Sequence, residues 1–102
     1  MAVQHTDYET VEASQTAQVL GPNGNSGDVL ERLIIVPAAV AAGAVSIKDG
    51  TAGDAIVVYA AGVNLVDIAP IVVEIGARCT AVGGWQVTTG ASVSVIAVGR
   101  FT

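Results

Sequence analysis

The last part of the chain alternates apolar and polar side chains in a pattern that predicts two β-strands. Residues 85–89 and 93–101 are rich in β-branched and aromatic side chains, and the loop of residues 90–92 separates them. Two such runs around a short loop that contains glycine are typical of a β-hairpin. We therefore predict that the chain ends in a hairpin.

The second of these runs is apolar on both faces. One face carries Val93, Val95, Ala97, Gly99 and Phe101. The other face carries Ser94, Ile96, Val98 and Arg100. Because both faces have an apolar middle, neither is expected to remain in water. The Val93 face has the larger ring and no charge, so we assign it to the core and expect the other face to contact a neighbouring subunit.

Residues 30–37 repeat this arrangement. Leu33 and Ile35 share one face, and Arg32, Ile34 and Val36 share the other. Strands that are apolar on both sides have to be covered on both sides. The candidate contact residues for an oligomer or another partner are therefore Arg32, Ile34, Val36, Ile96, Val98 and Arg100.

Four further short runs are predicted to be strands, and turns rich in Gly and Asp separate several of them. These runs are residues 44–49, 55–60, 68–75 and 78–82. Seven or eight short strands with turn signals every 8–12 residues or so indicate an antiparallel β-sandwich or a jelly roll. We place this all-β domain at residues 29–102.

The first 28 residues differ from this pattern. Residues 15–20 could form one short strand, and residues 21–28 are dense in turn-forming side chains. We expect residues 1–28 to form an extended N-terminal arm and loop. Such an arm is either a frayed terminus or a segment laid across a neighbour.

Composition suggests that one copy of the domain is only marginally stable. The 102 residues include 18 Val and 17 Ala, but only one Trp, one Phe and two Tyr. Valine favours strands, but small side chains each bury little area. Partners could supply the missing burial. Together with the two strands that are apolar on both faces, this predicts a homo-oligomer, which we expect to be a trimer.

The charge balance and the hydropathy pattern exclude several classes of partner. Nine acidic side chains against four basic ones give a net charge of −5, and four dispersed cations do not make a surface that follows nucleic-acid phosphates. The longest uncharged apolar-rich run, residues 33–47, is shorter than the roughly 20 residues that span a bilayer. We therefore expect no nucleic-acid or membrane partner, and we find no secretory signal pattern.

The sequence offers no set of residues suited to catalysis or to binding a metal ion. His5 is the only histidine and lies in the expected arm, while Cys79 is the only cysteine and is typical of a small buried side chain. Neither a nucleophile–base pair nor a zinc-ligand spacing is present. Asp49 and Asp54 flank a glycine turn, but this turn does not match an EF-hand loop. We assign no catalytic residue, cofactor or metal, and we expect the chain not to be an enzyme.

Trp85 allows two interpretations. Its ring could fill the core between two sheets, or it could form an exposed platform on which a sugar stacks. The first is the usual role of a lone Trp in a β-sandwich.

Four segments of the chain resemble a known family. They are residues 27–37, 43–50, 70–76 and 84–99, and the resemblance extends over residues 27–101. Their apolar strands and glycine turns are similar to those of small β-sandwich structural proteins of tailed bacteriophages, of the head decoration or cement type. The loop at residues 37–43 and the acidic arm do not match that pattern.

The resemblance implies a virion protein with a structural role. A decoration protein binds the exterior of the capsid and clamps neighbouring copies of the major capsid protein against the pressure of the packaged DNA. The implied partners are the major capsid protein and further copies of the chain. Similar small β proteins occur in phage tails and fibres, so a receptor- or carbohydrate-binding module of the tail remains the alternative.

Overall fold

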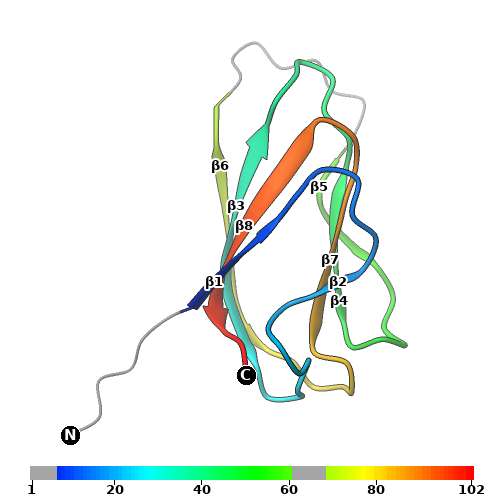
Figure 1. Ribbon diagram of the computed structural model, residues 1–102, viewed down its shortest axis with the longest axis vertical. Helices are drawn as coiled ribbons and strands as arrows, with labels where there is room; N and C mark the ends of the chain where they lie inside the picture. Colours follow the sequence, from blue (N-terminus) through cyan, green and yellow to red (C-terminus); the bar gives the residue numbers. More distant parts are fainter. Residues whose placement is uncertain (1–6, 61–68) are drawn as a thin grey trace, which may run out of the picture.

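The computed structural model describes residues 7–60 and 69–102, and all regular secondary structure in these two ranges is β-strand (Figure 1). The strands are β1 (Asp7–Val11), β2 (Gln18–Val19), β3 (Val29–Pro37), β4 (Val45–Asp49), β5 (Ile56–Tyr59), β6 (Ile71–Arg78), β7 (Trp85–Thr89) and β8 (Val93–Arg100).

The strands form two four-stranded antiparallel sheets that pack face to face. One sheet has the order β1-β8-β3-β6 and the other the order β2-β7-β4-β5. In Figure 1 the two sheets are seen as two layers, the first on the left and the second on the right. Each strand pairs with the one equally far from the other end of the chain: β1 with β8, β2 with β7, β3 with β6, and β4 with β5. This nested pairing is that of a jelly roll, one of the two β architectures that the sequence left open.

The core forms where the inward faces of the two sheets meet. Its largest fully buried side chains include Leu20, Leu30, Leu33 and Ile35. Val93, Val95 and Ala97 are buried as well, which confirms that this face of the last strand points into the sandwich. Trp85 is only 5% exposed and belongs to the same cluster, so its ring fills the core and does not form a sugar platform.

The predicted C-terminal hairpin is wrong. Both strands exist, but β7 and β8 belong to different sheets, and the connection between them crosses from one layer to the other. In a sandwich, the inward faces of two successive strands can meet across the core as well as side by side. Local alternation predicts the strands but does not distinguish these two arrangements.

The β7–β8 crossing is held by close backbone contact with the β3–β4 connection. Gly43 donates its N–H to the carbonyl of Ala91, and Gly90 donates to the carbonyl of Ala44, each at 2.8 Å. A Cβ atom on Gly43 would lie 2.7 Å from the Cα of Gly90, which is too close for any real side chain. Glycine at both positions therefore allows the two crossings to pack backbone against backbone.

The boundaries of the sixth strand also differ from the prediction. The chain remains in β6 as far as Arg78, and residues 79–84 form the connection to β7 with no strand of their own. Part of the predicted strand at residues 68–75 lies outside the described residues.

The expected N-terminal arm is contradicted over residues 7–28. β1 pairs along β8 from Asp7↔Gly99 to Val11↔Val95, and β2 pairs with β7 inside the predicted run of residues 15–20. Val11 and Leu20 are fully buried. Two of the acidic side chains that suggested an arm have partners within the sandwich. The carboxylate of Glu9 accepts hydrogen bonds from Gln18 and from the backbone of Gly21, and that of Asp7 accepts one from the backbone of Phe101. Residues 1–6 lie outside the described range.

Because β1 belongs to the sandwich, removing residues 1–14 should destabilise the whole domain. The deletion exposes the edge of β8 and removes Val11 from the core, at a cost of about 3 kcal/mol or more. Urea unfolding followed by circular dichroism measures the loss, and a chain that lacks only residues 1–6 separates the effect of β1 from that of the preceding residues. An unchanged unfolding midpoint after the longer deletion would show that β1 contributes nothing to stability.

Candidate interaction surface

The central strands of the two sheets differ in the polarity of their outward side chains. On the β2-β7-β4-β5 sheet the central strands direct Ser46, Lys48, Gln86 and Thr88 outward, opposite the buried Val45 and Ile47. Exposed apolar side chains on this face, Val19 and Val57, belong to its two edge strands. A polar outer face and an apolar inner face are usual for an antiparallel sheet. The β1-β8-β3-β6 sheet departs from this rule.

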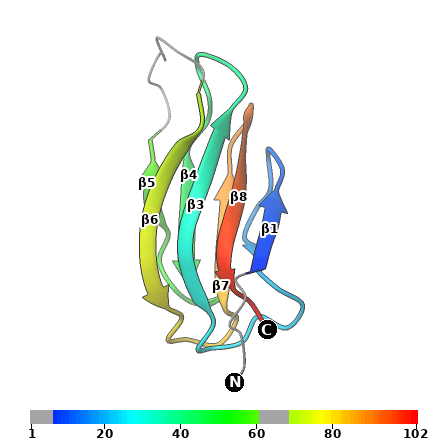
Figure 2. The same ribbon diagram turned by 90° about the vertical axis from the view of Figure 1, so that its left-hand side faces the viewer.

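We call the outward side of the β1-β8-β3-β6 sheet the outer sheet face. Its central residues lie in rows across the strands: Ile34 is the register partner of both Ile96 and Val72, and Val98 is the partner of both Tyr8 and Arg32. Figure 2 views the molecule from this side. The face consists of Tyr8, Thr10, Val29, Arg32, Ile34, Val36, Val72, Glu74, Arg78, Ser94, Ile96, Val98 and Arg100.

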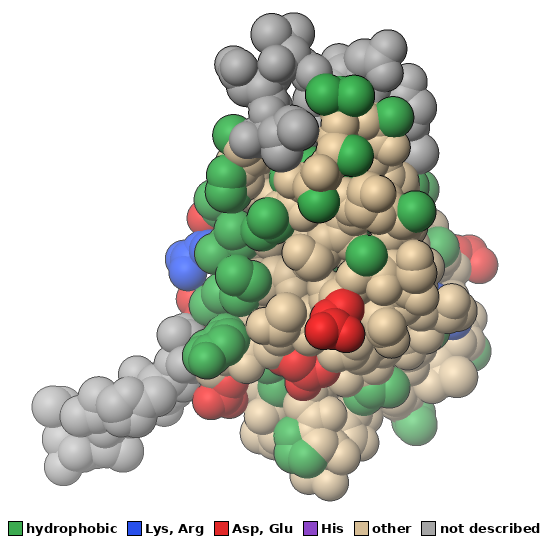
Figure 3. Space-filling view, turned by 45° about the horizontal axis from the view of Figure 1, so that its top comes forward, with side chains coloured by type: hydrophobic (Ala, Val, Ile, Leu, Met, Phe, Trp, Pro, Cys, Tyr) green, Lys and Arg blue, Asp and Glu red, His purple; other side chains and the backbone are tan. Residues whose placement is uncertain are grey.

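Apolar side chains on this face are in contact with water. Tyr8 is 74% exposed and Val72 is 56% exposed, while Ile34, Ile96 and Val98 are partly exposed between them. In Figure 3, hydrophobic side chains gather along the left-hand side of the molecule, which is the side of this sheet. A contiguous exposed apolar area is typical of a protein–protein contact.

The outer sheet face also concentrates positive charge. All three arginines of the chain, Arg32, Arg78 and Arg100, belong to it, although the chain as a whole has a net charge of −5. The Arg32 Nε atom lies 3.2 Å from an oxygen of Glu74, which forms an ion pair across β3 and β6. This exposed pair contributes little stability, but it fixes the position of one guanidinium beside the apolar rows.

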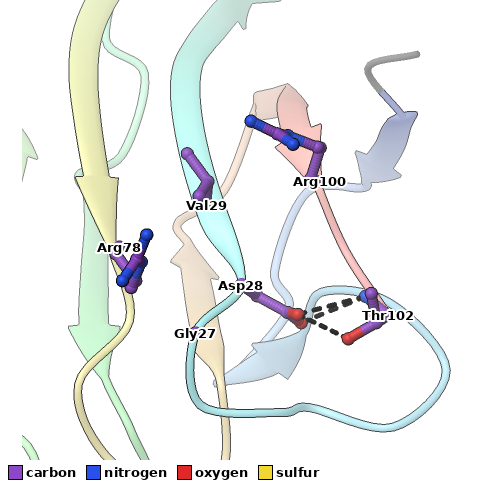
Figure 4. Close-up of a pocket in the computed structure, with 6 residues that line it drawn as sticks. All are labelled: Gly27, Asp28, Val29, Arg78, Arg100 and Thr102. Carbon is purple, nitrogen blue, oxygen red and sulfur yellow. Dashed lines mark hydrogen bonds between the residues drawn. The ribbon is translucent and has the colours of Figure 1, made fainter. Parts of the chain in front are cut away.

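The two other arginines border a hollow at the end of the sheet where β8 ends. Val29 on β3 is the register partner of Arg78 on one side and Arg100 on the other, and the three residues lie side by side in Figure 4. The hollow has a volume of about 300 Å³ and is also lined by Gly27, Asp28 and Thr102. Asp28 is buried, and its carboxylate accepts hydrogen bonds from the backbone N–H and the hydroxyl of Thr102.

All six residues proposed from the sequence as contact residues lie on the outer sheet face. Arg32, Ile34 and Val36 come from β3, and Ile96, Val98 and Arg100 come from β8, the two central strands of this sheet. Their role in a contact stays a prediction. Sequence reasoning did not assign Tyr8, Val72, Glu74 or Arg78 to the same face. Tyr8 was placed in an arm. The sequence of β6 has apolar residues on both faces, so the sequence alone did not show which face of this strand points outward.

Asp49, at the end of β4, holds the start of the β6–β7 connection in place. The carboxylate of Asp49 accepts hydrogen bonds from the backbone N–H of Thr80 at 2.8 Å, from its hydroxyl at 2.5 Å and from the thiol of Cys79 at 3.0 Å. These donors, above all the Thr80 hydroxyl, lower the pKa of Asp49 to about 2. Burial, together with the contact to Asp49, raises the pKa of the Cys79 thiol, so the thiol stays protonated and buried.

The acidic and histidine side chains that were considered as metal ligands do not form a site in the described part of the chain. Among residues 7–60 and 69–102, no three His, Cys, Asp or Glu side chains lie close enough to hold a metal ion. Asp54 is exposed and forms no such cluster with Asp49, while His5 lies outside the described residues. A search of the described part of the chain for a helix with the length and hydropathy needed to cross a bilayer finds none.

Comparison of the chain with models of protein families, with curated proteins and with solved structures finds no match in any of the three.

The low pKa of Asp49 predicts a pH dependence of stability. The folded-state pKa of about 2 lies below the usual 3.8, so the ionised carboxylate stabilises the fold. This contribution is complete above the unfolded-state value and is lost as the pH falls from about 4 to 2. Urea unfolding of the wild type and of Asp49→Asn should differ most at pH 5–7 and converge near pH 2. A difference that is the same at pH 2 and pH 6 would contradict this assignment.

The two faces of β8 predict opposite responses to a buried charge. Val95 is fully buried, so Val95→Asp places an unpaired carboxylate in the core and should unfold the chain, at a cost of about 3–5 kcal/mol or more. Ile96 is partly exposed on the outer sheet face, so the carboxylate in Ile96→Asp can reach water and the monomer should stay folded. Circular dichroism distinguishes the outcomes, and the reverse result would place the core on the other side of β8.

Proposed function

We propose that this chain is a structural virion protein that decorates the exterior of a tailed-bacteriophage capsid and clamps neighbouring major capsid subunits. The observation that carries the proposal is the outer sheet face, an exposed apolar surface bordered by all three arginines of the chain. Asp49 and Cys79, by contrast, bond to each other and serve the fold.

The resemblance found in the sequence coincides with this surface. Residues 27–37 contain β3 and residues 84–99 contain most of β8, and these two strands supply the centre of the outer sheet face. The jelly roll is a fold that many viral shell proteins use, although it also occurs in proteins with other functions. The proposal therefore rests on the outer sheet face together with the resemblance, and the fold gives it secondary support.

Clamping follows from the chemistry of the face. Covering an apolar surface on a capsid contributes about 25 cal/mol for each Å² removed from water. Arginine forms bidentate hydrogen bonds with carboxylates, so guanidinium groups at the border of the patch would fix the orientation of the docked domain. A domain held across a joint between two capsid subunits adds this energy to the joint and resists its opening.

Binding to phage heads that lack the protein tests the proposal. Ile34→Asp and Ile96→Asp should each weaken binding at least about tenfold, because each would place an unpaired carboxylate in the contact. Ser46→Asp, on the polar outer face of the other sheet, is the matched control and should bind as the wild type does. Equal binding by all three variants would exclude the outer sheet face as the docking surface.

Reconstruction of the virion at side-chain resolution tests the location. Density for the jelly roll on the shell, with the outer sheet face against the major capsid protein, is the expected result. Density on the tail or on a fibre would instead favour the receptor- or carbohydrate-binding alternative.

A further inference from the structure

The four edge strands of the sandwich are not equally protected against pairing with another chain. β2 has two residues, β5 has four and β1 has five, whereas β6 has eight. An edge strand leaves a row of backbone N–H and C=O groups unpaired, and folded proteins usually keep such strands short, charged or kinked. β6 is the longest of the four edge strands.

The first part of β6 has the composition of a strand that pairs. Residues 71–75 read Ile-Val-Val-Glu-Ile, without lysine, proline or glycine, and their only charge belongs to Glu74, which is paired with Arg32. Pro70 lies just before this stretch. Beyond it the ladder to β3 is irregular, and Gly76 has a φ of 63°. The regular edge is thus limited to Ile71–Ile75.

Exposed apolar side chains lie on the same side of the sandwich. β5 and β6 are the edges of their two sheets on this side, as Figures 1 and 2 show. Ile56 and Val57 of β5 are 52% and 62% exposed, and Ile71 and Val72 of β6 are exposed as well. Among the described residues, β6 therefore has an unpaired backbone edge with exposed apolar side chains beside it.

We propose that β6 pairs with β6 of a second copy of this chain, in an antiparallel arrangement with its two-fold axis at Val73. The stretch is self-complementary in this register. Ile71 faces Ile75 of the other copy, the two Val73 residues face each other, and Val72 faces Glu74. Cross-strand apolar pairs of this kind stabilise a sheet, and no like charges are opposed.

Antiparallel pairings of β6 with the axis at Val72 or Glu74 would be less stable than the one at Val73. In the joined sheet, the outer sheet faces of the two copies should lie on the same side. This requires the two-fold axis to pass through a residue and not between two residues, because moving the register by one residue turns every side chain to the other face. An axis at Glu74 would place two carboxylates opposite each other. An axis at Val72 would place Pro70 opposite Glu74, where proline cannot donate to the ladder. The pairing builds a dimer, in place of the trimer expected from the sequence.

The dimer would double the outer sheet face. One copy offers roughly a dozen outward side chains, whereas a standard protein–protein contact uses roughly 20–30 residues on each side. Two copies joined at β6 present a continuous eight-stranded sheet whose outer face reaches that size. This consequence rests on the proposed function, but the pairing itself does not.

Opposite charges at position 72 test both the pairing and its register. In the proposed dimer this side chain faces Glu74 of the other copy, so Val72→Glu creates two repulsive contacts and should raise the dimer dissociation constant at least about tenfold. Val72→Lys creates two attractive contacts and should leave the dimer intact. Val82→Glu is the control, since Val82 is 86% exposed in the β6–β7 connection. Sedimentation of the purified chain between 1 and 100 µM provides the measurement.

Each outcome decides the question. A wild-type chain that is monomeric at 100 µM overturns the proposal, and so does a Val72→Glu variant that dimerises as the wild type does. Loss of the dimer in both position-72 variants overturns the Val73 register. Hydrogen exchange supplies a second readout without substitution: the amides of residues 71–75 should exchange more slowly at high protein concentration. Both measurements need no capsid, so their failure is distinguishable from a failure to bind phage heads.

Discussion

The pairing of β3 with β8 is the contact on which the rest of the molecule depends. The two strands lie side by side from Val29↔Arg100 to Pro37↔Val93 at the centre of their sheet. Their inward side chains, among them Leu33 and Val95, form the middle of the core. Their outward side chains form the middle of the outer sheet face. Because residues alternate strictly from Arg32 to Pro37, one register determines both surfaces along this part of the ladder.

The asymmetry of the two sheets follows from this arrangement. The two central strands of the β2-β7-β4-β5 sheet follow the usual division into an apolar inner face and a polar outer face, and segments before β2 bond to the Thr88 and Thr89 side chains. The β1-β8-β3-β6 sheet keeps apolar side chains on both faces, so the free domain leaves part of its hydrophobic stabilisation unused. A surface of this kind is explained by contact with a partner better than by the fold of a single copy.

Much of the fold could be predicted from residue alternation alone. The all-β class, the inward face of the last strand and the six central residues of the outer sheet face all follow from the side-chain period of two. The pairing of strands did not follow, because alternation is the same whether two successive strands share a sheet or face each other across the core. β1 was missed because Asp7, Glu9 and Glu12 hide its pattern, and only the structure shows Gln18 and Gly21 bound to the Glu9 carboxylate. Val72 was not assigned to the outer sheet face because the β6 sequence is apolar at both its odd and its even positions.

The nested order of the strands has a consequence for biosynthesis. β1 pairs with β8, so β1 leaves the ribosome well before the partner strand that lies at the other end of the sandwich sequence. At about 5–20 residues per second, β1 waits for several seconds before its ladder can form. During that interval β3 also lacks β8, and its two apolar faces are open to other chains. Completion of this sandwich therefore waits for β8, and a cell that makes the chain has to keep β1 and β3 apart from other chains until that strand arrives.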